Sequence, residues 1–287
     1  MRAHTAETVV VPLSDAELEM VKKLHAAWHM GFSHSVPQDM LALCERLEER
    51  VQRAVWGGGA GGGGAAPYFV KTSMRSPKDA VKVEHAPDDP PHVRLRNEVA
   101  ACAVRSASAA IELCTASRRV VTDISYYQRY RIPGIPLNLV LRKWDSDVAG
   151  GVEWRCFIAD GRLTAISQYH CYTALPEITS PTGHGETVRT NLAKLRGCLV
   201  AFQRRVHTDV VRCIGAASYV LDLATQRSAR CEGFEVRLVE VNPIHMSGAA
   251  LFSWKADRPT LLGRPGGARR ADGLVELRVV GAVVGRV

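Results

Sequence analysis

The segment EWRCFIADGRLTAISQY (residues 153–169) is the feature that most constrains how this chain can fold. Two apolar-rich runs of β-forming residues flank Asp160-Gly161, and this dipeptide tolerates the positive φ angles that a tight hairpin turn requires. The pattern predicts a β-hairpin, so part of the chain must form an antiparallel sheet.

The composition is that of an ordinary globular protein. The chain has 287 residues, 46% of them hydrophobic and 23% charged, which allows one large core or two fused lobes. Residues 1–7 lack the apolar core of a signal peptide, and no stretch approaches the roughly 18 uninterrupted apolar residues of a membrane span. The eight cysteines include no CxxC pair. We therefore expect reduced thiols, no membrane association and a cytoplasmic location.

The net charge of +8 and the isoelectric point near 9.2 favour an anionic partner. This partner could be nucleic acid, an acidic protein surface or the phosphates of a nucleotide. The basic residues form no block longer than the doublets Arg118-Arg119 and Arg269-Arg270. This scattering favours a generally basic surface, and we expect no direct nucleic-acid binding.

The N-terminal part is predicted to alternate strands and helices. The run TVVVPL (8–13) is β-forming, and Ser14 with Glu17 has the capping-box pattern that begins a helix. A second helix follows Pro37, with apolar residues at helical spacing. Gly57–Gly64 lacks the Gly-Lys-Ser/Thr of a phosphate-binding loop, so we interpret it as a flexible connector.

Further strands and helices are predicted downstream. Tyr68–Thr72 is a strand that carries Lys71, and the alanine-rich stretch from Asn97 has the propensity of one long helix. The linker IPGIP (132–136) leads into the strand Leu139–Trp144.

This linker separates two predicted lobes. The N-terminal lobe spans 8–135, including the Gly-rich connector 57–64, and the C-terminal lobe spans 136–258. A helix is predicted from about Glu186, and its apolar stripe consists of Val188, Leu192, Leu195, Leu199 and Phe202. Two strands with a polar loop between them follow it. For the tail 259–287 the sequence leaves open a further strand or a loosely held segment.

The predicted strand EVRLVEVNPIH (235–245) has an unusual polar end. Strict alternation would place four of its side chains on one face, namely Val236, Leu238, Glu240 and Asn242. If Tyr219–Leu223 forms the other arm of a hairpin, Asp222 comes opposite or nearly opposite Glu240. Two carboxylates would then face each other.

Facing carboxylates need a positive partner, because like charges across a strand pair are destabilising and costly to bury. A divalent metal such as magnesium, bound with ATP, would meet this need through hard oxygen ligands. Alternatively, Asp222 caps a turn and Glu240 pairs with Arg237 or another arginine. Four basic residues on otherwise apolar predicted strands favour the nucleotide interpretation, namely Lys71, Arg142, Lys143 and Arg155.

Several motifs occur in the order and approximate spacing of the cell division cycle 123 family. They are VVVPL, YFVKTSMRSPKDA, LVLRKW, EWRCFIADGRLTAISQYHCY, YVLDL, and VEVNP followed by LFSW. The chain resembles this family from about Thr8 to Trp254, and the hairpin and the SPKDA segment are the most specific parts. The resemblance implies an α+β, ATP-grasp-like fold, with a nucleotide cleft between a small α/β lobe and a larger antiparallel β-sheet lobe.

The resemblance also implies roles for individual residues in binding ATP and Mg²⁺. Lys71 is expected to contact the phosphates, and the strand Leu139–Trp144 to supply the hinge beside adenine. The residues expected to bind the nucleotide are Lys71, Arg142, Lys143, Trp144, Arg155, Asp222, Glu240 and Asn242. The last three match the family's magnesium ligands, where aspartate is usual at the position of Glu240.

The family's members are ATP-dependent assembly factors for eukaryotic translation initiation factor 2. They bind its gamma subunit and promote its union with the alpha subunit, so the resemblance implies a monomeric chaperone of the cytosol rather than a turnover enzyme. Two further departures from the family pattern bear on partner binding: Phe-Gly and an aspartate are absent from PIHMSGAALFSW, and the early Trp-Tyr-Pro-Lys-Phe motif is not recognisable.

Two other functions stay open from the sequence. The ATP-grasp superfamily consists mostly of ligases that activate a carboxylate as an acyl-phosphate, and fold alone does not decide between ligase and assembly factor. A basic RNA-binding module is the third possibility, and it would show steeply salt-dependent RNA affinity and indifference to ATP.

Overall fold

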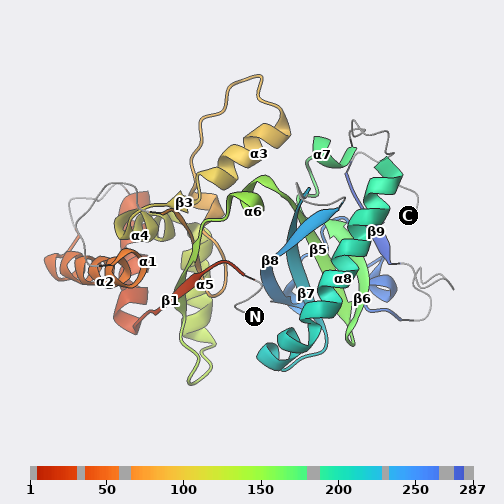
Figure 1. Cartoon of the computed structure of the whole chain (residues 1–287). Helices are drawn as coiled ribbons and strands as arrows, with labels where there is room; N and C mark the ends of the chain where they lie inside the picture. The colour runs from red at the N-terminus through yellow and green to blue at the C-terminus, as the bar shows by residue number, and fades with distance from the viewer. Residues whose placement is uncertain are drawn as a thin grey trace. The chain divides into compact units, whose positions relative to one another are not determined.

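The computed structural model describes residues 5–30, 36–57, 66–179, 188–227, 233–264 and 275–280. The chain divides into two compact units. The N-terminal unit comprises Ala6–Asp89 and Val93–Trp144, and the C-terminal unit comprises Met1–Thr5, Pro90–His92 and Asp145–Val287. Figure 1 shows the helices and strands of both units, with labels where there is room. The predicted connector 57–64 falls, apart from Gly57, outside the described residues.

A four-stranded antiparallel sheet forms the centre of the N-terminal unit. Its order is β1 (Thr8–Pro12), β4 (Asn138–Lys143), β2 (Tyr68–Thr72) and β3 (Ala103–Val104). Because β4 pairs with both β1 and β2, it belongs to this unit, whereas the sequence-predicted division at 135/136 assigned it to the C-terminal lobe.

Two long helices bury their apolar stripes in this unit. Helix α1 (Asp15–His29) begins with the predicted capping box, since the amide of Glu17 donates to Ser14 Oγ and the amide of Ser14 donates to Glu17 Oε2. Helix α2 (Gln38–Trp56) buries Leu47 and Val51, as its spacing predicts.

The prediction of one long helix from Asn97 is wrong. This stretch instead contains α3 (Pro91–Ala100), α4 (Ala107–Ala116) and α5 (Arg118–Arg129). The breaks occur at Ser106 and Ser117, whose side chains accept hydrogen bonds from the first turns of α4 and α5. The alanine-rich composition indicated a high helical propensity, but it did not indicate that the capping residues Ser106 and Ser117 would interrupt the helix.

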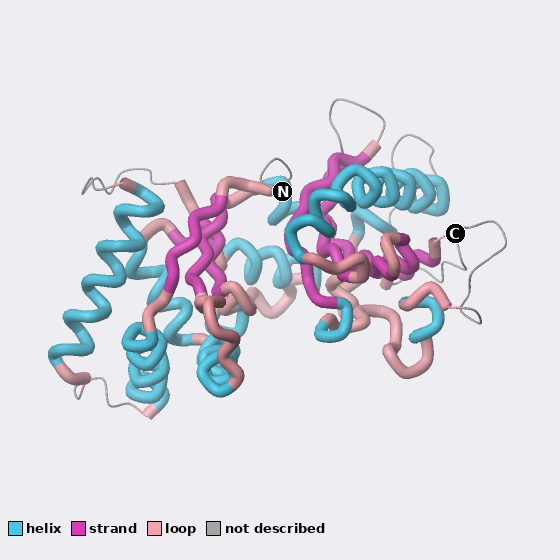
Figure 2. Tube along the Cα trace, turned by 90° about the horizontal axis from the view of Figure 1, so that it is seen from below, coloured by secondary structure: helices cyan, strands magenta, loops and turns pink. Residues whose placement is uncertain are grey.

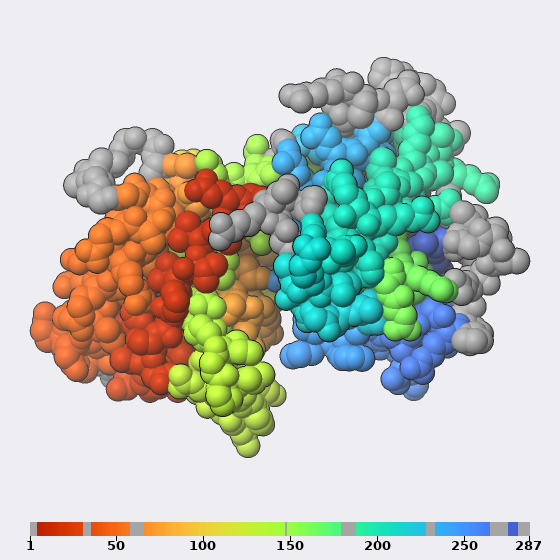
Figure 3. All heavy atoms as spheres, turned by 60° about the horizontal axis from the view of Figure 1, so that its bottom comes forward, coloured from red at the N-terminus to blue at the C-terminus, as the bar shows by residue number. Residues whose placement is uncertain are grey.

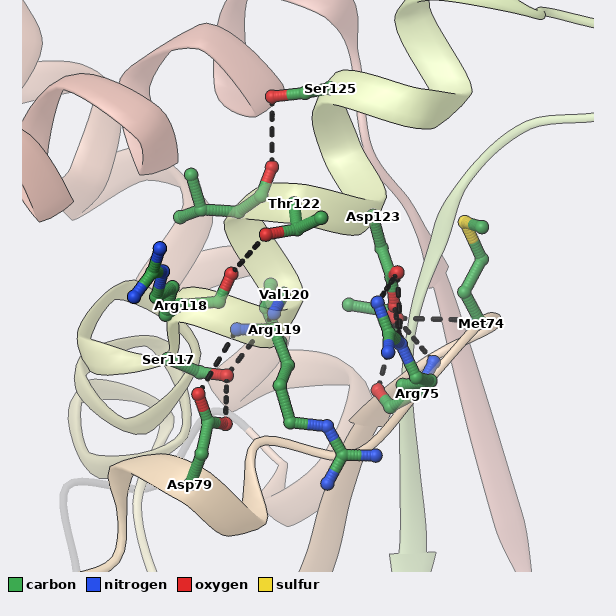
Figure 4. A network of polar contacts seen from close by, with 12 residues as sticks. Met74, Arg75, Asp79, Ser117, Arg118, Arg119, Val120, Thr122, Asp123 and Ser125 are labelled. Atoms are coloured by element: carbon green, nitrogen blue, oxygen red, sulfur yellow. Dashed lines mark hydrogen bonds and ion pairs between the residues drawn. The ribbon is translucent and has the colours of Figure 1, made fainter. Parts of the chain in front are cut away.

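A polar network fixes the SPKDA segment against α5, as Figure 4 shows. The Asp79 carboxylate, on the 3-10 helix η3 (Lys78–Ala80), accepts hydrogen bonds from Ser117 Oγ and from the amide of Arg119. The guanidinium of Arg75 donates to both oxygens of the buried Asp123. The two bonds of Asp79 place a negative charge at the N-terminus of α5, where the helix dipole favours it.

The C-terminal unit is built on a five-stranded sheet. Its order is β8 (Phe234–Pro243), β7 (Tyr219–Arg227), β5 (Val152–Ala159), β6 (Arg162–Gln168) and β9 (Glu276–Arg278). All pairs are antiparallel except β6 with β9, so part of the tail adds a strand. The predicted hairpin is confirmed: β5 and β6 join through Asp160 and Gly161, whose φ angles are 48° and 77°.

Layers of different kinds cover the two faces of this sheet. Helix α8 (Val188–Ile214) lies along one face, in teal in Figure 1 and cyan in Figure 2, and buries the leucines of its predicted stripe. The segment after β8, with η4 (Ile244–Met246) and α9 (Arg258–Leu261), packs on the other face through a cluster around Phe157 and Phe252. Two short helices, α6 (Ser146–Gly150) and α7 (Pro176–Thr179), complete this unit. Within the described part of the chain, no helix has the length and apolarity to span a membrane.

Candidate functional site

Asp222 lies at the centre of a polar cluster in the C-terminal sheet. It stands in the middle of β7, opposite Arg155 of β5 on one side and Glu240 of β8 on the other. Residues directly opposite each other in an antiparallel pair project from the same face of the sheet. The three side chains therefore lie side by side on one face, and the predicted pairing of Asp222 with Glu240 is confirmed.

A β-bulge in β8 determines which face carries Glu240. Leu238 stands opposite Leu223 and Glu240 opposite Asp222, so Val239 is the extra residue. The prediction that Val236, Leu238, Glu240 and Asn242 share one face is therefore wrong. Without the bulge, Glu240 would project from the opposite face, on the side of α8.

Arg155 supplies the positive charge beside the buried Asp222. Its Nε and Nη2 donate to the two carboxylate oxygens of Asp222 at 2.9 and 2.8 Å, and its Nη1 donates to the carbonyl oxygen of Gly248 at 3.1 Å. The guanidinium also lies over the ring of Tyr169, 4.7 Å from its centroid. From the sequence we expected either a metal ion between the two carboxylates, or a turn cap by Asp222 with an arginine beside Glu240. In the structure Asp222 lies within β7 and pairs with Arg155, so it does not cap a turn.

Asn242 completes the cluster. Its Nδ2 donates to Asp222 Oδ2 at 2.9 Å, so three donors approach a carboxylate that offers about four lone-pair sites. With the side-chain nitrogen of Asn242 assigned as the donor of this bond, its side-chain oxygen is able to interact with another group.

The donor chemistry of these residues fits magnesium. Two carboxylates and an amide oxygen on one face are hard oxygen ligands, the type that Mg²⁺ prefers. Among the described residues there is no group of three His, Cys, Asp or Glu side chains that could hold a metal ion. A magnesium site here would therefore rely on Asn242 and on oxygens of the bound ligand, in addition to the two acids.

The charge states follow from burial and pairing. Burial raises the pKa of Asp222 to about 6 against the lowering effect of Arg155, so this carboxyl is mostly ionised at neutral pH. Burial alone would lower the pKa of Arg155, but its hydrogen bonds to Asp222 and the charge of that carboxylate raise it overall. The pair is thus a fixed dipole of one cation and one anion in the sheet.

The other predicted nucleotide-binding residues lie on the sheet of the N-terminal unit. Lys71 of β2 stands opposite Val140, and Arg142 of β4 opposite Phe69, so Lys71 and Arg142 share one face. Lys143 lies on the other face, with its Nζ 3.5 Å from the carboxylate of Glu7. The amide of Trp144, directly after β4, donates to the carbonyl of Pro67. That these four residues bind a nucleotide together with the Asp222 cluster stays a prediction.

Tyr169 and the Gly248 carbonyl were not predicted as partners of Arg155. For Tyr169 a signal was available, since it follows Ser167 by two residues and Ser167 pairs with Arg155, which places both on the face of Asp222. Ser167 itself accepts a hydrogen bond from the amide of Leu251 at 3.0 Å. No sequence pattern indicated that the loop at Gly248 would reach Arg155.

Comparisons with known proteins agree with this architecture. The D123 family model matches residues 63–282. The structure is similar to that of C-terminally truncated Cdc123 from Schizosaccharomyces pombe, with a TM-score of 0.60 and 15% sequence identity over 98% of this chain and 92% of that chain. A second structure of Cdc123 from Schizosaccharomyces pombe gives a TM-score of 0.55 at 15% identity, over 97% of this chain and 91% of that one. A search of curated proteins finds no match.

Proposed function

Because the chain belongs to the D123 family, we propose that it is a magnesium–ATP-binding assembly factor for translation initiation factor 2. In this proposal it binds the gamma subunit in the cytoplasm and promotes the union of that subunit with the alpha subunit. The proposal takes the fold to be ATP-grasp-like, with one nucleotide site.

The observation that carries the proposal is the cluster of Arg155, Asp222, Glu240 and Asn242 on one face of three adjacent strands. Like-charged carboxylates directly across a strand pair are unfavourable for a sheet unless a cation compensates them. Arg155 pairs with Asp222, and Glu240 places a second carboxylate on the same face, next to the side chain of Asn242. Two carboxylates and an amide beside an arginine are a set of groups that suits a magnesium ion bound together with phosphate groups.

Each residue of the cluster has a distinct part in this proposal. Asp222, Glu240 and Asn242 would hold the metal ion, which when bound neutralises charge on the triphosphate. Arg155 would hold Asp222 in one orientation and provide a cation for a phosphate oxygen. Lys71 and Arg142 would contribute further positive charge to the same nucleotide.

ATP would act through linkage rather than through chemistry on a substrate. A nucleotide stabilises the conformation that it contacts best, and a protein partner that prefers this conformation then binds more tightly. Neither a covalent intermediate nor turnover is needed. The assembly role thus requires ATP binding, and it predicts slow or no hydrolysis.

The proposal is tested first by calorimetric titration of the full chain with ATP, with and without Mg²⁺. The affinity should depend on magnesium, and Glu240→Gln should weaken it by about 10-fold, the scale typical of altering a ligand shell. Glu235→Gln changes the same charge on the same strand and should leave the affinity unchanged. Glu240→Asp restores the residue that the family usually has, and it should bind at least as tightly as the parent. Equal effects of the substitutions at 240 and 235 would contradict the proposed site.

The assembly role needs a separate test with the purified gamma subunit. Capture of the gamma subunit should increase when Mg-ATP is present, and Glu240→Gln should remove this increase but keep the basal capture. Stoichiometric release of phosphate on addition of an amine or peptide acceptor would instead support a ligase. ATP binding without any capture of the gamma subunit would retain the nucleotide site and reject the partner.

A further inference from the structure

A groove lies between α8 and the edge of β8 on the opposite face of the C-terminal sheet from the Asp222 cluster. Its volume is about 660 Å³, and all of its lining belongs to the C-terminal unit. The lining residues are Thr5, Cys198, Ala201, Phe202, Arg205, Phe234, Glu235, Val236 and Arg237. Figure 3 shows α8, in teal, at the surface of this unit.

The floor of the groove is apolar and firmly held. Cys198, Ala201, Phe202 and Arg205 recur at helical spacing and so form one face of α8. The ring of Phe202 is buried, whereas Ala201 is exposed and leaves open space above it. Such a floor can accept an apolar side chain without rearrangement of the core.

The strand side of the groove separates apolar from charged groups. Phe234 and Val236 stand opposite Arg227 and Thr225 and share the face that packs against α8, together with Leu238. Glu235 and Arg237 alternate with them, so their side chains project from the other face. At the groove these two residues therefore present their backbone.

The side chains that remain around the groove are cationic. The guanidinium of Arg205 lies 4.9 Å from the centroid of the Phe202 ring, and that of Arg227 lies 5.5 Å from the centroid of the Phe234 ring. Both arginines are exposed, and the acidic residue of the described lining, Glu235, alternates with Phe234 and Val236 and so projects from the other face of β8. The electrostatic complement of this surface is a carboxylate.

The edge of β8 offers the groove a template for backbone hydrogen bonds. In the sheet order β8 is the outermost strand, and its pairing within the described ranges is with β7. Alternate residues of an edge strand direct their N–H and C=O groups away from the sheet, and an extended peptide can pair with them.

We propose that this groove binds an extended acidic segment of a partner protein, which adds as a strand to the edge of β8. The inward-facing positions of the segment carry an aliphatic side chain, for the floor at Ala201 and Phe202, next to a carboxylate for Arg205 or Arg227. The groove and the Asp222 cluster occupy opposite faces of the sheet, so this site is additional to the proposed nucleotide site and does not depend on it.

The test uses the full chain and a fluorescein-labelled peptide of sequence Thr-Leu-Thr-Glu-Thr-Leu-Thr-Glu-Thr, which presents leucine and glutamate alternately on one side. Fluorescence anisotropy at low salt should show binding in the micromolar to millimolar range, and replacement of both glutamates by lysine should abolish it. Arg205→Glu should weaken the binding by about 10-fold, equivalent to about 1.4 kcal/mol. Arg204→Glu is the matched control, because Arg204 is exposed on the same helix and does not line the groove.

Backbone pairing is tested separately from charge. Two N-methylated peptides are compared, one modified at its even-numbered residues and the other at its odd-numbered residues. One of them should lose binding, because its methyl groups block the amides that pair with β8, and the other should bind like the unmodified peptide. Hydrogen exchange of the β8 amides should slow when the unmodified peptide is added. Two results would overturn the proposal: binding of both N-methylated peptides, or an equal loss of binding in Arg204→Glu and Arg205→Glu.

Other occupants give different results, each of which also overturns the proposal. Dimerisation of the free chain that Ala201→Trp disrupts would assign the groove to a second copy. Peptide binding that appears only when residues 1–5 are removed would assign it to the N-terminal residues of the chain, since Thr5 is part of the lining. Tighter binding of single-stranded RNA than of the peptide, weakened by Arg205→Glu, would assign it to nucleic acid.

Discussion

The guanidinium of Arg155 makes two parallel hydrogen bonds to the carboxylate of Asp222, across the pairing of β5 with β7. Asp222 is completely buried, and the side chain of Arg155 is 13% exposed. A buried charge that loses its partner is far more costly than the intact pair.

Arg155→Met should therefore destabilise the C-terminal unit, by about 3 kcal/mol at pH 8. The substitution removes the arginine that lowers the pKa of Asp222, so this pKa should rise above its present value of about 6. A carboxyl with a raised pKa in the folded state loses its favourable contribution as the pH rises through that pKa. The loss should thus be smaller at pH 5 than at pH 8, as urea unfolding at the two pH values would show. Adding Asp222→Asn to Arg155→Met should restore most of the stability at pH 8, and failure to do so would contradict this account of the pair.

The bulge at Val239 gives a second prediction. Deletion of Val239 restores strict alternation and should turn Glu240 to the α8 side of the sheet, or else shift the register of the residues before it. We expect lower stability and loss of magnesium-dependent ATP binding, measured by thermal unfolding and calorimetry. Val239→Ala keeps the residue count and should retain ATP binding. Unchanged affinity after the deletion would show that Glu240 is not part of the site.

The sequence predicted those elements that local chemistry determines. The turn at Asp160-Gly161, the capping box at Ser14 and the apolar stripe of α8 depend on residues close in the chain, and all three are present. The opposition of Asp222 and Glu240 was also predicted, because a hairpin register follows from its two arms.

Features that depend on tertiary context were not predictable in the same way. The bulge leaves no mark in the sequence of β8, and the hydrogen bond from Arg155 to Gly248 joins segments 93 residues apart. The break before α5 depends on Ser117, whose hydroxyl also donates to Asp79, 38 residues earlier. Such contacts are decided by packing and not by propensity.

Gly161 allows a direct test of the hairpin turn. Its φ of 77° is strained for any residue with a side chain, and a Cβ atom there would lie 3.0 Å from Nε2 of His207. Gly161→Ala should lower the free energy of unfolding by about 1–3 kcal/mol. Gly197→Ala is the control, because Gly197 lies inside α8 with open space around its Cβ position, and it should raise that free energy by about 0.5–1 kcal/mol. Equal shifts in the two thermal midpoints would contradict the predicted strain.

The last prediction concerns acid and the attachment of β9. Both Nη atoms of Arg278 donate to the carboxylate of Asp257, at 2.9 and 2.8 Å, and Nη1 also donates to the carbonyl of Leu251. The hydrogen bond with Arg278 is the main cause that lowers the pKa of Asp257 below its usual value of 3.8. A carboxyl with a lowered pKa contributes stability that is fully present above 3.8 and is lost as the pH falls through the folded-state pKa.

Acidification below pH 3.8 should therefore release β9 from β6, and the amides of Glu276–Arg278 should exchange faster with solvent. Asp257 is partly exposed, so the expected change in the free energy of unfolding is at most about 1 kcal/mol. In Asp257→Asn these amides should exchange faster already at pH 7 and respond little to acid. Arg264→Gln removes an exposed arginine from the same region and should exchange like the parent at both pH values. If Asp257→Asn kept both the slow exchange at pH 7 and the acid response, the ion pair of Asp257 with Arg278 would not be what holds β9 against β6.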